Sequence, residues 1–378
     1  MRAKVLGVTC ISVLCSILVA GLWPFHTPKN EVTWLPGRNG LRFGEYGTIL
    51  SSKVFSRKDW GDGQSCTIEI WVAPGLTFDT NTLLAFYSPT GAIPFSVRQS
   101  NKDLLIVGEA QRSQSHGQGP TLYVDDVFLQ GRSVFLTVAS DGRETSVFVN
   151  DALVKEAKAF RLSAADLIGQ VVLANSPLGP DTWSGELRGL ALYNQAVTAA
   201  QVLRHYSAWT KSGKPGLAEG DHAIALYLFD ERSGSTIRNH AGPGPDLYVP
   251  ERFMNLHQAL LQRPWEEYHP GWGYWKEVLI NIGGFIPLGF FFCAYLQLAW
   301  HAHRAVLITI VCGAAVSVTI EVLQAFLPTR DSGMTDIITN TLGTAVGAGL
   351  FGNATRLCGA LSRSGRASVR DIARLLAE

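Results

Sequence analysis

The residues best suited to chemistry lie near the C-terminus, in the stretch 317–349. Two apolar segments there flank a short polar turn, and they carry side chains that hydrocarbon tolerates poorly. Glu321 and Gln324 are three residues apart, so they share one helix face. Ionisable groups inside a membrane span are costly and usually face a protein interior or a wet cavity. We therefore expect one shared polar site, composed of Asn281, Glu321, Gln324, Arg330, Asp331, Asp336 and Asn340.

Three kinds of chemistry fit this set of side chains. Arg330 could pair bidentately with the phosphate or carboxylate of an anionic, lipid-linked headgroup. Glu321 and Asp336 could instead act as acid and base on a polyprenyl-phosphate-linked substrate, if desolvation separates their proton affinities. A third interpretation is a buried ion network, in which Glu321, Arg330 and Asp336 serve only as a structural anchor. The sequence contains no nucleophile motif, so enzymatic activity stays uncertain, and no residue is assigned as catalytic.

Four apolar stretches are long enough to position these groups within a membrane. A spanning helix needs about 17–25 residues, and the stretches are 5–23, 278–300, 305–327 and 335–352. Pro287 and Gly289 should bend the second stretch. Gly343 and Gly347 are spaced to let the fourth stretch approach another helix closely.

Positive charges predict the orientation of these stretches. Arg2 and Lys4 precede the first stretch and should keep the N-terminus in the cytoplasm. We interpret that stretch as an uncleaved anchor, with a cleaved signal peptide as the alternative. The loop 301–304 and the tail 353–378 are also positive. We therefore expect a multi-pass inner-membrane protein with both termini in the cytoplasm and its polar site in the outer leaflet.

Composition changes in the exported middle of the chain. Short β-branched and aromatic runs recur between turn-forming residues, at 67–72, 83–87, 104–107, 134–138, 146–149 and 171–173. Such spacing predicts a β-sandwich. A helix is expected at 198–209, with Thr198 as its N-cap and Val202, Leu203 and Tyr206 as its apolar stripe. Trp60, Trp183 and Tyr193 could stack on a sugar or pack in the core.

Several classes of function are disfavoured by composition and spacing. The net charge is +1, so no overall basic field argues for nucleic acid. Cys66 is the one cysteine of the middle region, which therefore cannot form an internal disulfide. No Cys/His metal spacing and no carboxylate cluster typical of calcium are evident, so we predict no metal and no cofactor. Residues 241–277 combine a Gly-Pro linker with an aromatic belt at the membrane interface.

The middle region resembles a laminin-G-like, concanavalin-A-type jelly roll. The resemblance lies in CTIEIWVAP at 66–74, in the hairpin around Asp141-Gly142 and 147–151, and in the closing segment 185–201. Residues 223–239 resemble the strand usually found at the start of that fold, so we expect them to complete the sheet. The resemblance implies a lectin-like domain that binds a glycan or an envelope protein.

The C-terminal stretches resemble the VanZ-like membrane family. The matching positions are Asn281, Phe285, Pro287, Leu288, Gly289, Glu321, Gln324, Arg330, Ser332, Asp336, Asn340, Gly343 and Gly347. Asp331 follows Arg330 directly, which leaves open whether Asp331 or Ser332 takes the family's position. The resemblance implies an envelope role, with glycopeptide (teicoplanin) resistance or envelope polysaccharide processes as the context, and a membrane lipid or lipid-linked precursor as partner.

Together these features predict a multidomain chain in which a jelly-roll sandwich is inserted into a four-helix transmembrane bundle. The expected parts are a first span at 1–24, a sandwich at 38–240, an interfacial linker at 241–277, a three-helix membrane core at 278–352 and a cytoplasmic basic tail at 353–378.

Overall fold

The chain folds into two compact units. A computed structural model describes residues 2–61, 63–75, 80–108, 121–129, 131–179, 181–211, 221–268, 271–299 and 301–375, without the side chains of 2–3, 266, 299 and 355–375. One unit comprises residues 27–257, and the other comprises 1–26 together with 258–378. The helical unit is therefore built from two stretches separated by the whole β unit. The side chains of the predicted basic tail lie outside the described residues from 355 onward.

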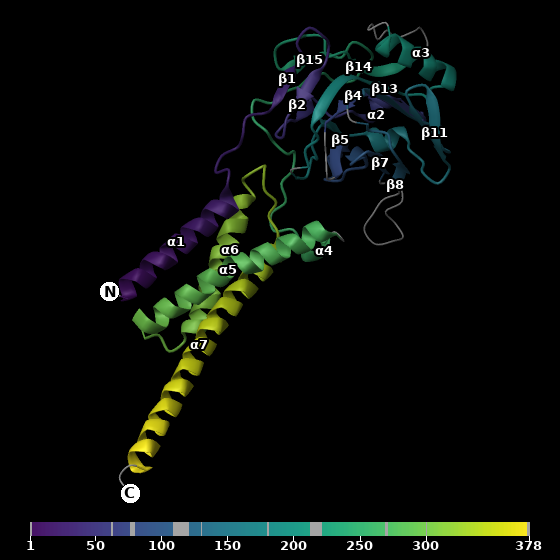
Figure 1. The fold of residues 1–378 in the computed structure, drawn as a ribbon. Coiled ribbons are helices and arrows are strands. Elements are labelled where there is room, and N and C mark those ends of the chain that lie inside the picture. Colours follow the sequence, from purple (N-terminus) through teal and green to yellow (C-terminus); the bar gives the residue numbers. More distant parts are fainter. Residues whose placement is uncertain are drawn as a thin grey trace. The chain divides into compact units, whose positions relative to one another are not determined.

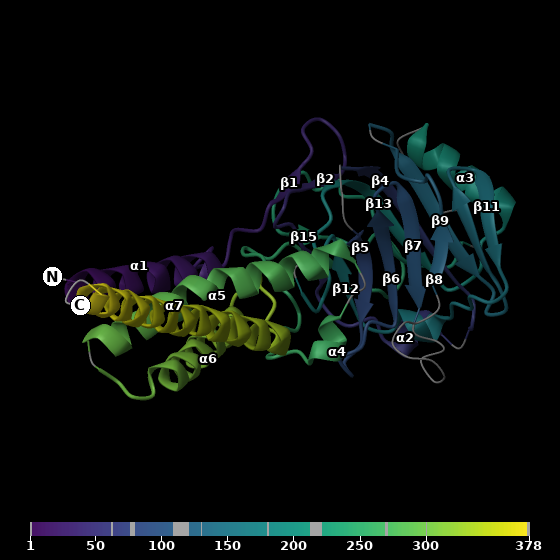
Figure 2. The ribbon, with the colours of Figure 1, turned by 60° about the horizontal axis from the view of Figure 1, so that its bottom comes forward.

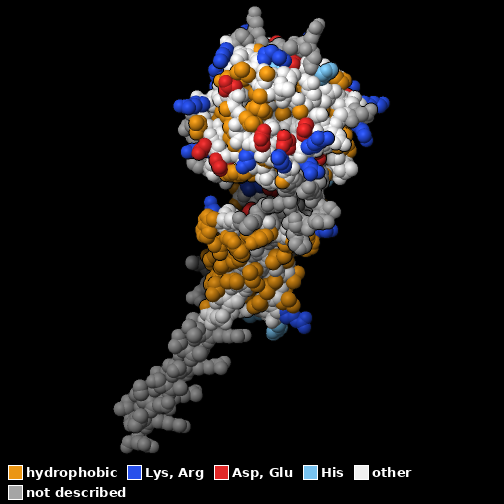
Figure 3. Space-filling model, turned by 90° about the vertical axis from the view of Figure 1, so that its right-hand side faces the viewer, with side chains coloured by type: hydrophobic (Ala, Val, Ile, Leu, Met, Phe, Trp, Pro, Cys, Tyr) orange, Lys and Arg blue, Asp and Glu red, His pale blue; other side chains and the backbone are white. Residues whose placement is uncertain are grey.

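The helical unit consists of long apolar helices that pack side by side (Figures 1 and 2). Its elements are α1 (Arg2–Leu22), the short α4 (Pro264–Glu267), α5 (Trp272–Ala299), α6 (Ala305–Gln324) and α7 (Met334–Leu375). The outer face of this unit in Figure 3 is dominated by hydrophobic side chains. Ile11, Leu279 and Val311 are each more than half exposed to solvent, as expected for helices that face lipid.

Three of these helices are long and apolar enough to cross a membrane: Lys4–Leu22, Trp272–Leu298 and Ala305–Gln324. Among the described residues, the start of α7 is not a further candidate, so the predicted four-helix transmembrane bundle is not confirmed. The physical reason is composition, because Asp336, Asn340 and several threonines and glycines dilute the apolar residues of 335–352.

Small residues set the spacing of α5, α6 and α7. A Cβ added to Gly343 would lie 2.2 Å from the carbonyl oxygen of Ile282, and one added to Gly289 would lie 2.1 Å from that of Thr344. A Cβ on Gly313 of α6 would meet the Thr344 side chain at 2.5 Å. A Cβ added to Gly347 would lie 2.1 Å from the carbonyl oxygen of Ile286 in α5. Backbones therefore approach closely along the α5–α7 contact.

The β unit is a sandwich of two sheets. The first sheet has the order β1-β2-β13-β4-β9-β10-β11, with β14 also paired to β13, and the second has the order β15-β16-β3-β12-β5-β6-β7-β8. Figure 2 shows the strands of this unit in layers. The bounds are β1 (Val32–Trp34), β2 (Leu41–Phe43), β3 (Ile49–Ser51), β4 (Cys66–Pro74), β5 (Thr80–Tyr87), β6 (Phe95–Ser100), β7 (Asp103–Gly108), β8 (Thr121–Val124), β9 (Val134–Ser140), β10 (Thr145–Val149), β11 (Ala152–Ala157), β12 (Gln170–Leu173), β13 (Gly185–Tyr193), β14 (Ala223–Tyr227), β15 (Thr236–Ile237) and β16 (Leu247–Tyr248).

The core of the unit lies between the two sheets. Ile68 and Ile70 of β4 point inward with Leu84 and Phe86 of β5, and all are almost fully buried. Every strand expected from the sequence is present. Trp60, Trp183 and Tyr193 are at most 1% exposed, so they pack in the interior and cannot stack on a sugar.

Helix α3 (Ala199–Thr210) covers the outer face of the first sheet. Thr198 is its N-cap, as predicted, and its side chain accepts a hydrogen bond from the Gln201 backbone. The predicted stripe was wrong at Leu203, which is 49% exposed, because Val202, His205 and Trp209 form the buried face instead. The Trp209 ring packs directly on Gly189 of β13, where an added Cβ would lie 2.2 Å from the indole ring. Two short helical turns, α2 (Arg57–Trp60) and η1 (Ala164–Leu167), complete the unit.

Candidate functional site

Glu321 lies at the centre of the polar region of the helical unit. Its side chain projects from α6 and is 1% exposed. One carboxylate oxygen accepts a hydrogen bond of 2.8 Å from the backbone N–H of Gly333, immediately before α7. Because Gly333 opens α7, the carboxylate lies at the positive end of that helix dipole.

Asp336 faces α5 rather than α6. Its Oδ1 accepts a hydrogen bond of 2.8 Å from Nδ2 of Asn281. The side chain is partly buried. The structure therefore brings Asp336 and Asn281 together, as two members of the predicted set from different helices.

Two buried amides border the carboxylates. Gln324 is 7% exposed and donates from Nε2 to the backbone carbonyl of Gly21 in α1, at 2.8 Å. Asn340 is 5% exposed, and its Nδ2 lies 3.0 Å from the Ser317 hydroxyl. Ser317 is one turn before Glu321, and Asn340 is one turn after Asp336. We call Asn281, Ser317, Glu321, Gln324, Asp336 and Asn340 the polar layer.

Arg330 does not join the carboxylates. Its Nε and Nη2 donate to the carbonyl oxygen of Trp23 at 3.0 and 2.6 Å, and Nη2 also donates to that of Ala20 at 3.2 Å. A cation at these free carbonyls stabilises the C-terminal end of α1. Within the described part of the chain, no ion pair joins Arg330 to Glu321. Asp331 is exposed and outside the layer.

The segment 258–267 covers the turn between α6 and α7. Gln258 donates from Nε2 to the carbonyls of Gln324 and Arg330, at 3.1 and 2.8 Å, and to that of Leu327. Ser332, a residue of the family pattern, accepts from the backbone of Leu261 at 3.2 Å. These bonds were not predictable, because backbone acceptors in a turn leave no signal in the sequence.

Glu267 adds a carboxylate to the start of α7. Its Oε2 accepts from the backbone N–H of Thr335 at 3.0 Å, as well as from the Thr335 hydroxyl. The carboxylate packs directly on Gly333, where a Cβ would overlap it. The charges of Glu267 and Glu277 act on both Glu321 and Asp336. Several carboxyl groups therefore lie close to the start of α7.

An apolar cavity lies next to the polar layer. It has a volume of about 260 Å³ and is lined from α1, α5 and α6 by residues that include Leu14, Leu288, Phe292, Gly313 and Val316. Val316, a lining residue on α6, directly precedes Ser317, and none of the polar-layer residues lines the cavity itself. A polar layer beside an apolar cavity is the arrangement that an amphiphilic molecule would need.

A buried polar cluster supports α3 in the sandwich. His205 is 2% exposed, with Nδ1 2.9 Å from Glu69 and Nε2 3.2 Å from Asp221. Tyr193 donates its hydroxyl to Glu69 at 2.8 Å and stacks on the imidazole. Arg204 pairs with Asp221 at 2.7 Å. Sequence reasoning missed this cluster, because its members come from separate strands and loops.

The sandwich also has a shallow pocket at its surface. It has a volume of about 290 Å³ and is lined by residues that include Tyr123, Asp125, Asp126 and Lys155. Tyr123 is 43% exposed, and its hydroxyl donates to Asp103. This hydrogen bond raises the pKa of Tyr123 to about 12 and lowers that of Asp103. An exposed aromatic ring beside carboxylates is suited to contact with a sugar.

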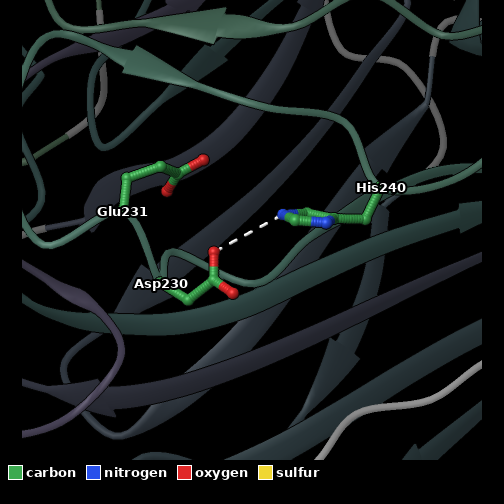
Figure 4. Close-up of side chains that lie close together, drawn as sticks. All are labelled: Asp230, Glu231 and His240. Atoms are coloured by element: carbon green, nitrogen blue, oxygen red, sulfur yellow. Dashed lines mark ion pairs between the residues drawn. The ribbon is translucent and has the colours of Figure 1, made fainter.

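Asp230, Glu231 and His240 form a small cluster beyond β14 (Figure 4). Their ligand atoms lie within 4.8 Å of one another, and His240 Nε2 is 3.4 Å from Asp230. The donor set could hold a metal ion, which sequence reasoning did not predict. Exposed acidic groups often gather without an ion, so we assign no function to this cluster.

The fold and the polar layer define a class: a concanavalin-A-like sandwich joined to apolar helices with a buried polar layer. Residues 48–203 match the family model of the concanavalin A-like lectin/glucanases superfamily, and residues 225–355 match that of VanZ/LLP1. The chain thus combines a concanavalin-A-like domain with a VanZ-like region, as the sequence predicted.

Solved structures resemble parts of the chain. A putative carbohydrate binding protein from Bacteroides ovatus is 13% identical, with a TM-score of 0.38 and coverage of 60% of this chain and 61% of that one. A SAP-like pentraxin from Limulus polyphemus is 12% identical, with a TM-score of 0.35 and coverage of 60% and 93%. A Trypanosoma rangeli sialidase is 14% identical, with a TM-score of 0.35 and coverage of 47% and 28%. The chain spans less than two thirds of the length of the sialidase and of the carbohydrate-binding protein. Comparison with curated proteins found no match.

Proposed function

We propose that the chain is an envelope protein of the inner membrane that holds a lipid or lipid-linked precursor in its polar layer. The observation that carries this proposal is Glu321, a carboxylate only 1% exposed inside a helix apolar enough to span a membrane. Such groups are costly in hydrocarbon and are usually functional. The adjoining cavity would accept the hydrocarbon part of the ligand.

The sandwich would bind a glycan or an envelope protein on the outer side. The exposed Tyr123 ring and the carboxylates beside it support a sugar contact. In this proposal both termini lie in the cytoplasm and the polar layer lies in the outer leaflet. Glycopeptide resistance and envelope polysaccharide processes are the biological contexts that we propose.

A second candidate is a structural anchor for the sandwich. It is favoured by Arg330 and Gln258, whose donors all go to backbone carbonyls and tie α1 and the α6–α7 turn together. In this account the polar layer only joins helices. Substitutions there would lower the amount of folded protein and leave no ligand to lose.

Native mass spectrometry of the detergent-purified protein tests the proposal. We expect a co-purified lipid on the wild-type protein, its loss from Asp336→Asn, and its retention on Glu251→Gln, which makes a similar change at an exposed position of the sandwich. A wild-type protein that carries no lipid, in several detergents and after lipid is added back, would reject the proposed function. Arg330→Lys should keep the lipid, because the guanidinium contacts α1.

A further inference from the structure

The polar layer has an excess of hydrogen-bond acceptors. Among the described residues, Oε1 of Gln324 and Oδ1 of Asn340 are buried and have no hydrogen-bond partner. Both side chains are more than nine-tenths buried. The orientation of Gln324 is fixed, because its Nε2 donates to the Gly21 carbonyl, which can only accept. A buried acceptor without a donor is unfavourable, so the Gln324 oxygen points to a ligand that donates a hydrogen bond.

The carboxylates add to this excess. Glu321 uses one oxygen for the Gly333 N–H, and Asp336 uses one for Asn281. Within the described chain, the second oxygen of each carboxylate has no donor. Glu267 and Glu277 contribute further negative charge, as described above. A ligand here would therefore meet hydrogen-bond acceptors and several carboxyl groups.

Within the described residues, neither Arg330 nor Lys276 forms an ion pair with Glu321 or Asp336. Arg330 is bound to the carbonyls of α1. Lys276 is exposed on α5. An anionic headgroup would be repelled by the carboxylates without gaining a guanidinium, which makes a phosphate an unsuitable ligand for the layer itself.

We propose that the polar layer binds the primary ammonium group of an amine-bearing envelope lipid, whose hydrocarbon chain occupies the cavity between α1, α5 and α6. An ammonium group supplies a positive charge and three donors, which suit Glu321, Asp336 and Gln324. The cavity lining is apolar, and it includes Val316, which directly precedes Ser317. This inference rests on the proposed function, because it specifies the chemistry of the ligand held there.

Two lipids with identical chains provide the direct test. Full-length protein in detergent is titrated with dioleoyl-phosphatidylethanolamine and dioleoyl-phosphatidylglycerol, and binding is measured by native mass spectrometry. Both lipids carry a phosphate, and the amine is present only in the first. We expect the ethanolamine lipid to bind about tenfold more tightly, a difference that one charge-assisted hydrogen bond can supply.

Matched variants separate the site from general lipid binding. Glu321→Gln should lower the affinity for the ethanolamine lipid by about tenfold and leave the affinity for the glycerol lipid unchanged. Glu251→Gln should alter the affinity for neither lipid. If Glu321→Gln does not fold, Asp336→Asn carries the same expectation. Wild-type protein that binds the glycerol lipid equally well or better would overturn the amine inference and leave the proposed function intact. Binding of neither lipid would overturn both.

A soluble amine identifies the source of the ammonium group. Glucosamine and ethanolamine are added as competitors of the ethanolamine lipid. The proposal expects little competition, because neither molecule has a chain to fill the cavity. Displacement at concentrations similar to that of the lipid would reject the lipid source and indicate an envelope amino sugar or another free amine.

Discussion

His205 is the residue whose charge state is most clearly set by its surroundings in the sandwich. Burial alone would lower its pKa, but the hydrogen bonds and charges of Glu69 and Asp221 outweigh burial, so the pKa is raised above 6.5. The folded protein therefore holds this proton more tightly than the unfolded chain does. The imidazole links α3 to β4 and to the segment before β14.

The sign of the resulting pH dependence follows from the raised pKa. Stabilisation by His205 is fully present below the unfolded pKa and is lost as the pH rises through the folded pKa. We expect the unfolding temperature of the sandwich transition to fall across that window above pH 6.5. Calorimetry of wild type and His205→Gln checks this expectation. A variant that keeps the same pH slope would show that other groups cause it.

At the level of single residues, the sequence could indicate which side chains matter but could not assign their partners. Glu321 and Gln324 stand out because polar groups are rare in apolar helices. Nothing in the sequence indicates that Arg330 binds the carbonyls of Trp23 and Ala20, because those acceptors belong to the backbone some 300 residues earlier. The anionic-ligand hypothesis depended on that guanidinium, so the structure favours a different ligand chemistry.

Among the secondary-structure elements, α5 and α7 form the closest helix contact, and glycine makes it possible. Gly343 touches the backbone of Ile282, whereas Gly349 of the same helix has open space around its Cβ position. Gly343→Leu should lower the free energy of unfolding by about 1–3 kcal/mol or more, because overpacking forces the helices apart. Gly349→Leu should change it by much less. Thermal unfolding in detergent measures both, and equal effects would contradict the close approach.

Strands and caps were predictable from local pattern, and helix faces less so. Every expected strand and the Thr198 cap are confirmed, because β-branched and aromatic runs, turn residues and capping residues are local signals. The prediction of the buried face of α3 was wrong at Leu203. His205 is buried instead because it contacts Glu69 and Asp221, and a hydrophobicity pattern does not reveal such polar contacts. The predicted fourth span is unconfirmed, because 335–352 mixes apolar with polar and small residues.

For the whole molecule, the proposed topology places the sandwich on the extracytoplasmic side of the membrane and both termini in the cytoplasm. Positive residues near α1 and in the loop 301–304 support this orientation. We expect a cysteine at Asp141→Cys, in the turn between β9 and β10, to react with a membrane-impermeant maleimide in intact cells. His303→Cys, in the loop between α5 and α6, should react only after permeabilisation. The reverse pattern would invert the topology and place the polar layer in the inner leaflet.

The insertion of the sandwich divides the helical unit into residues 1–26 and 258–378. Helix α1 is therefore separated in sequence from the helices that it contacts. Gln324 and Arg330 bind the carbonyls at its C-terminal end, which fixes α1 at the level of the polar layer. Helix α1 also supplies Leu14 to the lining of the apolar cavity.

The most direct test of the polar layer as a ligand site is the stability gained on adding lipid. Delipidated wild type and Glu321→Gln are unfolded thermally with and without dioleoyl-phosphatidylethanolamine. At a lipid concentration about 100 times the dissociation constant, wild type should gain about 2.7 kcal/mol. Glu321→Gln should gain much less stability than wild type when lipid is added, because it lacks the carboxylate that holds the ammonium group. A variant that is destabilised without lipid yet gains as much as wild type would contradict the account and make Glu321 a structural residue.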